Sequence, residues 1–321
     1  MAWLSLVITL LAEQLRALPA SNPVYASVRQ FSSWAEHNLN AGQPRHGVYA
    51  WLLVVVGLML AVGAVWSLLF SISWFLGLAL NVVVLYFALG FRQFSHHGSE
   101  IQIAITNGDL AAARRELTAW KRLSDPAYTA ADLSQDEVVR QAIEHGLLLA
   151  QRHVFGVFFW FVLLPGPMGA VFYRLAEHSA RVWNRPPAPP TPADRFGEFA
   201  RTAFAWIDWA PTRLTALGYA IVGDFEGAIY CWRQVARHPS KSDLPSPDAR
   251  TLILAAASGA LGLRLLPEAE AAAVFDEAGN EGAGLAEPRP EALRAVVGLV
   301  WRALLLWLAL LLLLTLAKWL A

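Results

Sequence analysis

The chain has few charged residues and almost no cysteine. Of its 321 residues, 16% are charged and 56% are hydrophobic, whereas soluble domains average about 25% and about 45–50%. Basic and acidic residues number 25 each, so no net field favours a nucleic-acid partner. The single cysteine, Cys231, excludes an internal disulfide and a multi-cysteine metal site. This composition argues against an ordinary soluble enzyme and indicates that the partner is a lipid bilayer.

Motifs that would identify a familiar catalytic or cofactor site are also missing. The chain has no nucleophile elbow, no phosphate-binding loop and no dinucleotide-binding glycine motif. Its histidines lack metal-ligand spacing, and neighbouring His96 and His97 point to different faces of a helix. No inverted repeat supports a transporter. We therefore predict no metal, no cofactor and no catalytic residue of these recognised kinds.

Long apolar segments are what the chain does have. Residues 47–91 contain no Asp, Glu, Lys, Arg or His. Because a membrane-spanning helix needs about 20 apolar residues, this stretch predicts a transmembrane hairpin with a hinge near Ser71–Ser73. Arg45 and Arg92 flank it, so the positive-inside tendency places both outer ends in the cytoplasm. A terminal transmembrane helix is predicted over 295–318.

The N-terminal segment is apolar but short. MAWLSLVITLLAEQLRA lacks a basic region before the apolar run and a small-residue cleavage site after it. We interpret it as a retained helix that is either embedded in the membrane or partly inserted into it. Surface connections are expected at 185–195, 238–248 and 267–291, where proline, glycine and polar residues accumulate.

Between the hairpin and the terminal helix, a polar block leads into a second apolar region. Residues 92–153 predict a cytoplasmic helical block, with Asp109 as an N-cap and Ser134 opening a capping box. The following helix enters an apolar run that Pro165 must interrupt, so 154–183 is predicted to be a broken embedded helix. The fold class is therefore all-α: one multi-pass membrane domain over 1–321, with about four embedded helices and a cytoplasmic helical layer. We expect it in the bacterial inner membrane.

Charged and polar side chains form stripes on either side of this break. At helical spacing, Gln141 to Arg152 and Arg174 to Arg181 each share a face, and antiparallel packing would bring Glu144 or Arg152 to Arg174 or Glu177. Two interpretations remain open: a pocket for an anionic or amide ligand at the cytoplasmic boundary, or solvated faces with intrahelical ion pairs. Asp208 and Arg213 flank Pro211 and form a possible ligand clamp. The ligand-binding candidates are Glu144, His145, Gln151, Arg152, Arg174, Glu177, Asp208 and Arg213.

Several segments resemble one known family. The run NGDLAAARRELTAWKRLSDPAYTAADLSQDEVVRQAIEHG (107–146) is similar to a cytoplasmic segment of the CobD/CbiB family. The likeness continues through GPMGAVFYRLAE (166–177), PTRL (211–214) and SPDARTLILAAASGALGLRL (246–265). The resemblance implies a membrane protein of late cobalamin assembly, which joins cobyric acid to an aminopropanol derivative through an amide bond.

Other segments resemble AmpE, a related inner-membrane protein linked with β-lactamase regulation. These are IDWAPTRL (207–214) and GLLLAQRHVFGVFFWF (146–161). Where the cobalamin enzymes have an acidic E-N-x-x-D-G motif, this chain has QRHVFG, with Phe155 in place of Asp. Their paired Asp before P-x-R-L fall on Phe204 and Ala205 here.

These departures decide the functional prediction. Amide synthesis from a nucleotide-activated acid needs carboxylates that hold metal and phosphate or act as a base. We therefore predict a non-catalytic, AmpE-like signalling or regulatory protein that binds a small-molecule ligand or a membrane or cytoplasmic protein partner at the cytoplasmic face. The alternative is a divergent adenosylcobinamide-phosphate synthase-like enzyme with carboxylates recruited from Glu144, Glu177 or Asp208.

Overall fold

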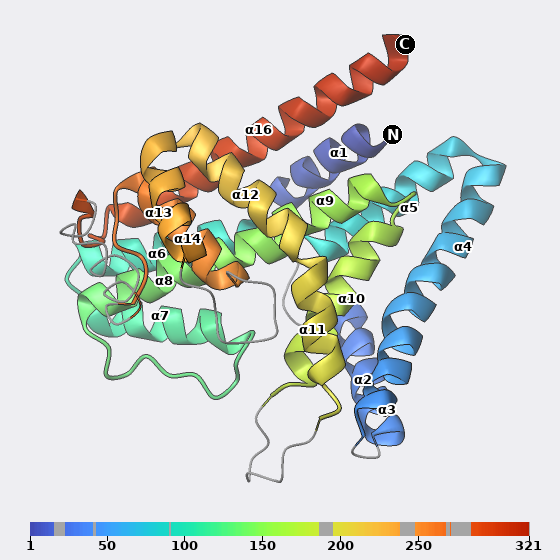
Figure 1. Ribbon diagram of the computed structural model, residues 1–321, viewed down its shortest axis with the longest axis horizontal. Coiled ribbons are helices and arrows are strands. Elements are labelled where there is room, and N and C mark those ends of the chain that lie inside the picture. Colours follow the sequence, from blue (N-terminus) through green and yellow to red (C-terminus); the bar gives the residue numbers. More distant parts are fainter. Residues whose placement is uncertain are drawn as a thin grey trace. The chain divides into compact units, whose positions relative to one another are not determined.

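The computed structural model describes residues 1–15, 23–40, 43–89, 91–185, 195–237, 248–267, 270 and 284–320 (Figure 1). Within these ranges every regular element is a helix, and an isolated bridge joins Leu263 and Ala286. The all-α prediction is confirmed. Most of the expected connections, at 186–194, 238–247 and 271–283, lie outside the described residues.

Three of the described helices are long and apolar enough to cross a membrane: Pro44–Ile72, Gln135–Leu163 and Ala292–Ala317. In the most apolar windows of the first and third, only 17% and 28% of the residues are buried within the chain, against 56% in the second. Most of the exposed side chains in these two helices are apolar, so a lipid environment suits them. The prediction of a helical membrane protein is confirmed.

The predicted hairpin forms two helices of unequal length. The first arm ends with α4 (Leu58–Ile72). Ser73 is extended, and its hydroxyl accepts a hydrogen bond from the backbone N–H of Phe75 at 3.3 Å, which caps α5 (Trp74–Ala88). The 15 residues of α5 rise about 22 Å, less than the about 30 Å of a bilayer's hydrocarbon core. That both arms cross a bilayer stays a prediction.

The chain divides into two compact units. Unit 1 comprises Met1–Gly90 and Arg152–Trp209, and unit 2 comprises Phe91–Gln151 and Ala210–Ala321. One boundary falls at η2 (Gln151–Phe155), a π-helical turn in the run from Gln135 to Leu163. Each unit has its own packed helices and is described separately.

Unit 1 has an aromatic core and a sharp break between two of its helices. Trp51 packs edge-on against Phe172 and Phe199. The Pro-Gly-Pro sequence ends one helix at Leu163 and allows the next to begin at Met168, because Gly166 adopts a φ of 59°. The helices of unit 1 are α1 (Ala2–Leu15), α2 (Pro23–Leu39), α3 (Pro44–Trp51), η1 (Leu52–Gly57), α4, α5, α9 (Gly156–Leu163), α10 (Met168–Val182) and α11 (Glu198–Ile207).

Unit 2 has capped helices and a close helix pair. Asp109 accepts from the N–H of Ala112 at 2.8 Å, and Ser134 accepts from that of Glu137 at 3.3 Å, so both predicted caps form. The carboxylate of Glu137 bonds instead to Arg140, as described below. The helices of unit 2 are α6 (Phe91–Thr106), α7 (Leu110–Arg122), α8 (Gln135–Ala150), α12 (Trp209–Val222, from Ala210 onward), α13 (Phe225–Arg237), α14 (Ala249–Leu261) and α16 (Ala292–Leu320).

Candidate functional site

A buried carboxylate on α10 is the centre of a charged cluster in unit 1. The side chain of Glu177 is 4% exposed. Its Oε1 accepts from Arg181 Nε at 3.0 Å, and its Oε2 accepts from Arg174 Nη1 at 3.4 Å. Positions 174, 177, 178 and 181 follow helical spacing, so α10 itself aligns this stripe. A charge this deep requires partners, and the two guanidinium groups supply them.

The charges around Glu177 keep it ionised. Burial alone would raise its pKa, but Arg181 and Arg174, with contributions from His153 and Arg152, hold the pKa well below its usual range. The pKa of neighbouring His178 is also lowered, which for a histidine favours the neutral form. Burial, reinforced by Arg181, lowers its pKa to about 4, so it is neutral at pH 7. Within the described part of the chain, the buried Nε2 of His178 has no hydrogen-bond partner.

Two further residues of this cluster come from the N-terminal helices. Tyr25 on α2 donates its hydroxyl to the carbonyl of Phe87 at 2.5 Å. Burial raises the pKa of Tyr25, Arg174 opposes that rise and Glu13 adds to it, so both groups lie near its hydroxyl. Glu13 on α1 is only 4% exposed. Our reading of the sequence missed both residues, although an acidic residue ending an apolar segment was an available signal.

Asp208 forms a second buried polar contact in unit 1. Tyr173 on α10 donates its hydroxyl to Asp208 Oδ1 at 2.7 Å, and the two residues are 0% and 2% exposed. Burial, together with the charge of Asp208, raises the pKa of Tyr173 well above its ordinary value. The Tyr173 ring lies directly over Gly156, where an added Cβ would overlap it. Gly156 therefore provides the space that brings Tyr173 to Asp208.

The remaining candidates lie in unit 2, in different surroundings. Glu144 accepts from Arg250 Nε at 2.7 Å, a contact that our reading of the sequence missed. His145 packs edge-on against Trp120, with ring centroids 4.8 Å apart. The amide of Gln151 donates to Thr212 Oγ1 at 3.1 Å, and Arg213 lies half-buried on α12.

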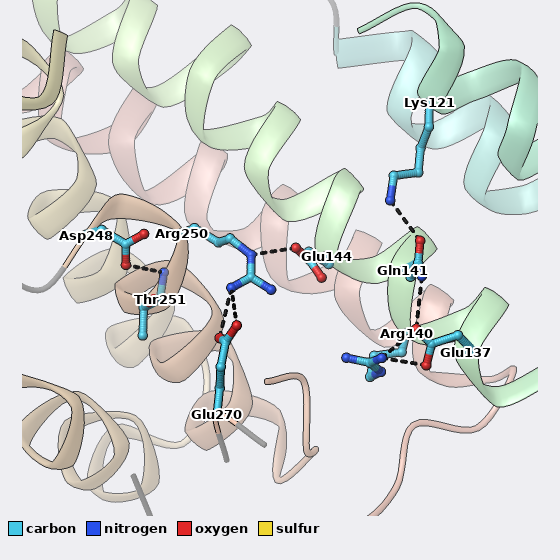
Figure 2. A network of polar contacts seen from close by, with 9 residues as sticks. All are labelled: Lys121, Glu137, Arg140, Gln141, Glu144, Asp248, Arg250, Thr251 and Glu270. Atoms are coloured by element: carbon cyan, nitrogen blue, oxygen red, sulfur yellow. Dashed lines mark hydrogen bonds and ion pairs between the residues drawn. The ribbon is translucent and has the colours of Figure 1, made fainter. Parts of the chain in front are cut away.

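Figure 2 shows that the polar face of α8 connects α8 to α7 and α14. Arg250 at the start of α14 reaches Glu144 and, through Nη1, Glu270 Oε2 at 2.8 Å. One turn earlier on α8, Gln141 Oε1 accepts from Lys121 Nζ at 2.8 Å. Glu137, in turn, accepts from Arg140 at 2.6 Å and from Gln141 at 2.9 Å. These residues are paired with one another. We interpret Lys121–Gln141 and Arg250–Glu144 as ties between helices, and the contacts of Glu137 as ion pairing within α8, rather than as a ligand site.

Replacing Arg250 with alanine should destabilise unit 2 modestly. Arg250, Glu144 and Glu270 are 29%, 19% and 44% exposed, so water screens the charges that lose their partner. We expect a loss of about 1 kcal/mol, measured as a lower midpoint of thermal unfolding in detergent. Arg264→Ala removes a more exposed pair with Glu287 (39% and 67%) and should change the midpoint much less. Equal midpoints for Arg250→Ala and wild type would show that the tie contributes no stability.

The predicted stripe from Gln141 to Arg152 ends in η2, whose first two residues are Gln151 and Arg152. A π turn contains more residues than the 3.6 of an α-helix, so α-helical spacing does not apply from Gln151 onward. Gln151 bonds within unit 2, whereas Arg152 belongs to unit 1 and acts on Glu177 there. We predicted that Glu144 or Arg152 would contact Arg174 or Glu177. The structure brings Arg152 near Glu177, whereas Glu144 pairs with Arg250. Asp208 and Arg213 belong to different units, so the clamp stays a prediction.

The fold and its buried charges define a class: a multi-helix membrane protein with an ionic cluster inside unit 1. Among the described residues, no three His, Cys, Asp or Glu side chains converge as metal ligands would.

Comparison with known proteins identifies the family. The family model described as CobD/Cbib protein matches residues 6–300. The chain is 31% identical over 310 residues to "Cobalamin biosynthesis protein CobD" of Stutzerimonas stutzeri, covering 95% of each chain. It is 33% identical over 231 residues to the protein of the same name from Chromobacterium violaceum, covering 71% of this chain and 68% of the relative. No solved structure matches. The chain therefore belongs to the CobD/CbiB family.

This result corrects the functional prediction from the sequence. The interpretation as a non-catalytic, AmpE-like signalling or regulatory protein was wrong, because the full-length relative and the second match are both named for cobalamin biosynthesis. The error arose because the absence of two short acidic motifs was given more weight than a likeness that spans nearly the whole chain. A missing carboxylate at one position does not exclude one supplied from elsewhere in the fold, and Asp208 and Glu177 are buried carboxylates of unit 1.

Proposed function

We propose that this chain is an inner-membrane protein of cobalamin biosynthesis that forms the amide bond expected from its family resemblance. The observation that carries the proposal is the match to a cobalamin biosynthesis protein along 95% of both chains. The apolar helices support a membrane location. The charged cluster of unit 1 supports a binding site for polar substrates within that unit.

Amide formation sets chemical requirements that unit 1 is suited to meet. The amine nitrogen attacks the activated carboxyl carbon, the leaving group departs with its electron pair, and the nitrogen loses a proton. A carboxylate can accept that proton as a general base. Cationic side chains can hold the anionic groups of the reactants in position.

Asp208 is our candidate for the general base. It follows Phe204 by four residues, one helical turn, so it brings a carboxylate to the face where the resemblance places acidic residues. The ring of Tyr173 packs against Phe204 at 5.6 Å between centroids, and its hydroxyl bonds to Asp208. Tyr173 would thereby orient the carboxylate during proton transfer.

Complementation tests this proposal. In a bacterium that lacks its own CobD/CbiB protein, wild-type chain should restore cobalamin-dependent growth. Asp208→Asn should lower the rate of amide formation in membranes by about 10²–10⁴-fold, because an amide cannot take the proton. Tyr173→Phe removes the hydrogen bond to Asp208 while keeping the carboxylate, so its effect should be much smaller.

Two controls separate chemistry from folding. The membrane abundance of each variant is measured by immunoblot, and Arg195→Ala, at a side chain 62% exposed, should behave like wild type. Wild-type chain that reaches the membrane but does not restore growth would refute the proposed function. Equal losses for Asp208→Asn and Tyr173→Phe would make Asp208 a structural residue instead.

A further inference from the structure

Two arginines share the single carboxylate of Glu177. Arg174 and Arg181 both form ion pairs with it, and the charge of Arg152 also lowers its pKa. The ion-paired group therefore comprises two cations and one anion. Arg185, just beyond the end of α10, adds positive charge that acts on His178. An unbalanced positive charge in a half-buried position is costly unless an anion neutralises it.

The two arginine side chains remain partly exposed. Arg174 is 17% exposed and Arg181 is 30% exposed, whereas Glu177 beneath them is 4% exposed. Their bonds to Glu177 use Nη1 of Arg174 and Nε of Arg181. A guanidinium group has five N–H donors in a planar fork, so each group can bond to Glu177 and to an outer anion together.

Glu177 also fixes where these guanidinium groups lie. Arg174 and Arg181 are seven residues apart, about 10 Å along the helix axis, yet both side chains converge on the same carboxylate. A buried carboxylate that holds two arginines reduces the entropy lost when they bind an anion.

We propose that Arg174 and Arg181, anchored by Glu177, bind a phosphate group on this face of α10. A phosphate has three terminal oxygens and up to two negative charges, which suits two converging forks better than a carboxylate does. That the bound phosphate belongs to a substrate rests on the proposed function. That these arginines bind phosphate does not depend on it. A phospholipid headgroup carries the same chemistry, so the experiment distinguishes it from free phosphate.

The test uses the full chain in nanodiscs of phosphatidylcholine. Inorganic phosphate at about 100-fold its Kd should raise the midpoint of thermal unfolding by about 5 °C, relative to chloride at the same ionic strength. Arg181→Gln should weaken phosphate binding at least tenfold, and Arg181→Lys should retain part of it. Arg195 pairs with Glu198 on an exposed surface, so Arg195→Gln is the matched control. This variant should bind phosphate as the wild type does.

A second arm replaces part of the phosphatidylcholine with phosphatidylglycerol, without free phosphate. A rise in the wild-type midpoint that Arg181→Gln abolishes would support the site and assign the anion to lipid. The inference is overturned if neither phosphate nor anionic lipid stabilises the wild type beyond chloride, or if Arg181→Gln and Arg195→Gln respond alike. If Arg181→Gln does not fold, phosphate binding is instead compared between the wild type and Arg174→Lys by phosphorus NMR titration. Weaker binding by Arg174→Lys supports the site, and equal or absent binding overturns it. Growth rescue without phosphate binding would sink this inference alone, and binding without rescue would sink the proposed function alone.

Discussion

Replacing Glu177 with alanine is expected to destabilise unit 1 by about 3 kcal/mol, because two guanidinium groups would lose the carboxylate between them. The value lies at the low end for a broken buried ion pair, since Arg174 and Arg181 are 17% and 30% exposed and water reaches them. Unfolding of the detergent-solubilised protein by heat or by denaturing detergent measures the change.

The matched variant Glu177→Gln separates charge from shape. Glutamine keeps the volume and one acceptor oxygen but loses the negative charge. If the negative charge of Glu177 is what stabilises unit 1, Glu177→Gln should be almost as destabilised as Glu177→Ala. A stability of Glu177→Ala equal to that of wild type would mean that the two arginines find other anions and that Glu177 does not hold the cluster together.

The same residue predicts how stability depends on pH. The pKa of Glu177 is lower in the folded protein than in the unfolded chain, where a glutamate titrates near pH about 4.3. Its contribution is therefore complete above that pH and is lost progressively as the pH falls toward the folded-state pKa. Wild type should lose stability below about pH 4 more steeply than Glu177→Gln, which lacks this titration.

Replacing Gly259 with alanine is expected to cost at least the upper end of the about 1–3 kcal/mol typical of overpacking. Gly259 lies where α14 crosses α13, and an added Cβ would overlap the carbonyl of Gly227 and the backbone nitrogen of Ala228. Backbone atoms within a helix cannot rotate away as a side chain would, so the two helices must separate. Loss of their packing would expose buried residues of α14, which are apolar from Leu252 to Ala257.

Gly298→Ala provides the control within the same unit. It lies inside α16, and a Cβ there would meet no atom within 4 Å. Alanine favours a helix by about 1 kcal/mol relative to glycine, so this variant should be neutral or slightly more stable. The thermal midpoints of the two variants, measured in the same detergent, compare them directly. A Gly259→Ala midpoint matching that of Gly298→Ala would show that the α13–α14 contact tolerates a methyl group.

Much of the architecture follows from patterns within a few residues of the chain. Apolar runs without charge predict helices for a membrane, Asp109 and Ser134 mark helix starts, and Pro165–Pro167 marks the break before Met168. These signals work because a helix is made by hydrogen bonds between residues four apart, and its burial follows a short period. The family likeness was also readable from the sequence, since it is distributed over most of the chain.

Part of the candidate site was also predictable. Arg174, Glu177 and Arg181 share a helix face, and their ion pairs follow from spacings of three and four residues. Sequence spacing could not find Tyr25 or Glu13, which come from separate helices. It also extended one stripe into η2, whose first two residues, Gln151 and Arg152, fall in different units.

From the sequence alone it follows that the chain is all-helical and suited to a membrane. The sequence also shows that one helix is broken at a pair of prolines and that the chain is related to the cobalamin proteins. Only the tertiary structure decided which charges meet: Glu144 with Arg250 across 106 residues, and Tyr173 with Asp208 across 35. The reason is physical. Local hydrogen bonding and hydropathy are encoded in neighbouring residues, whereas the partner of a buried charge depends on how distant helices pack, and that packing is set by the whole core at once.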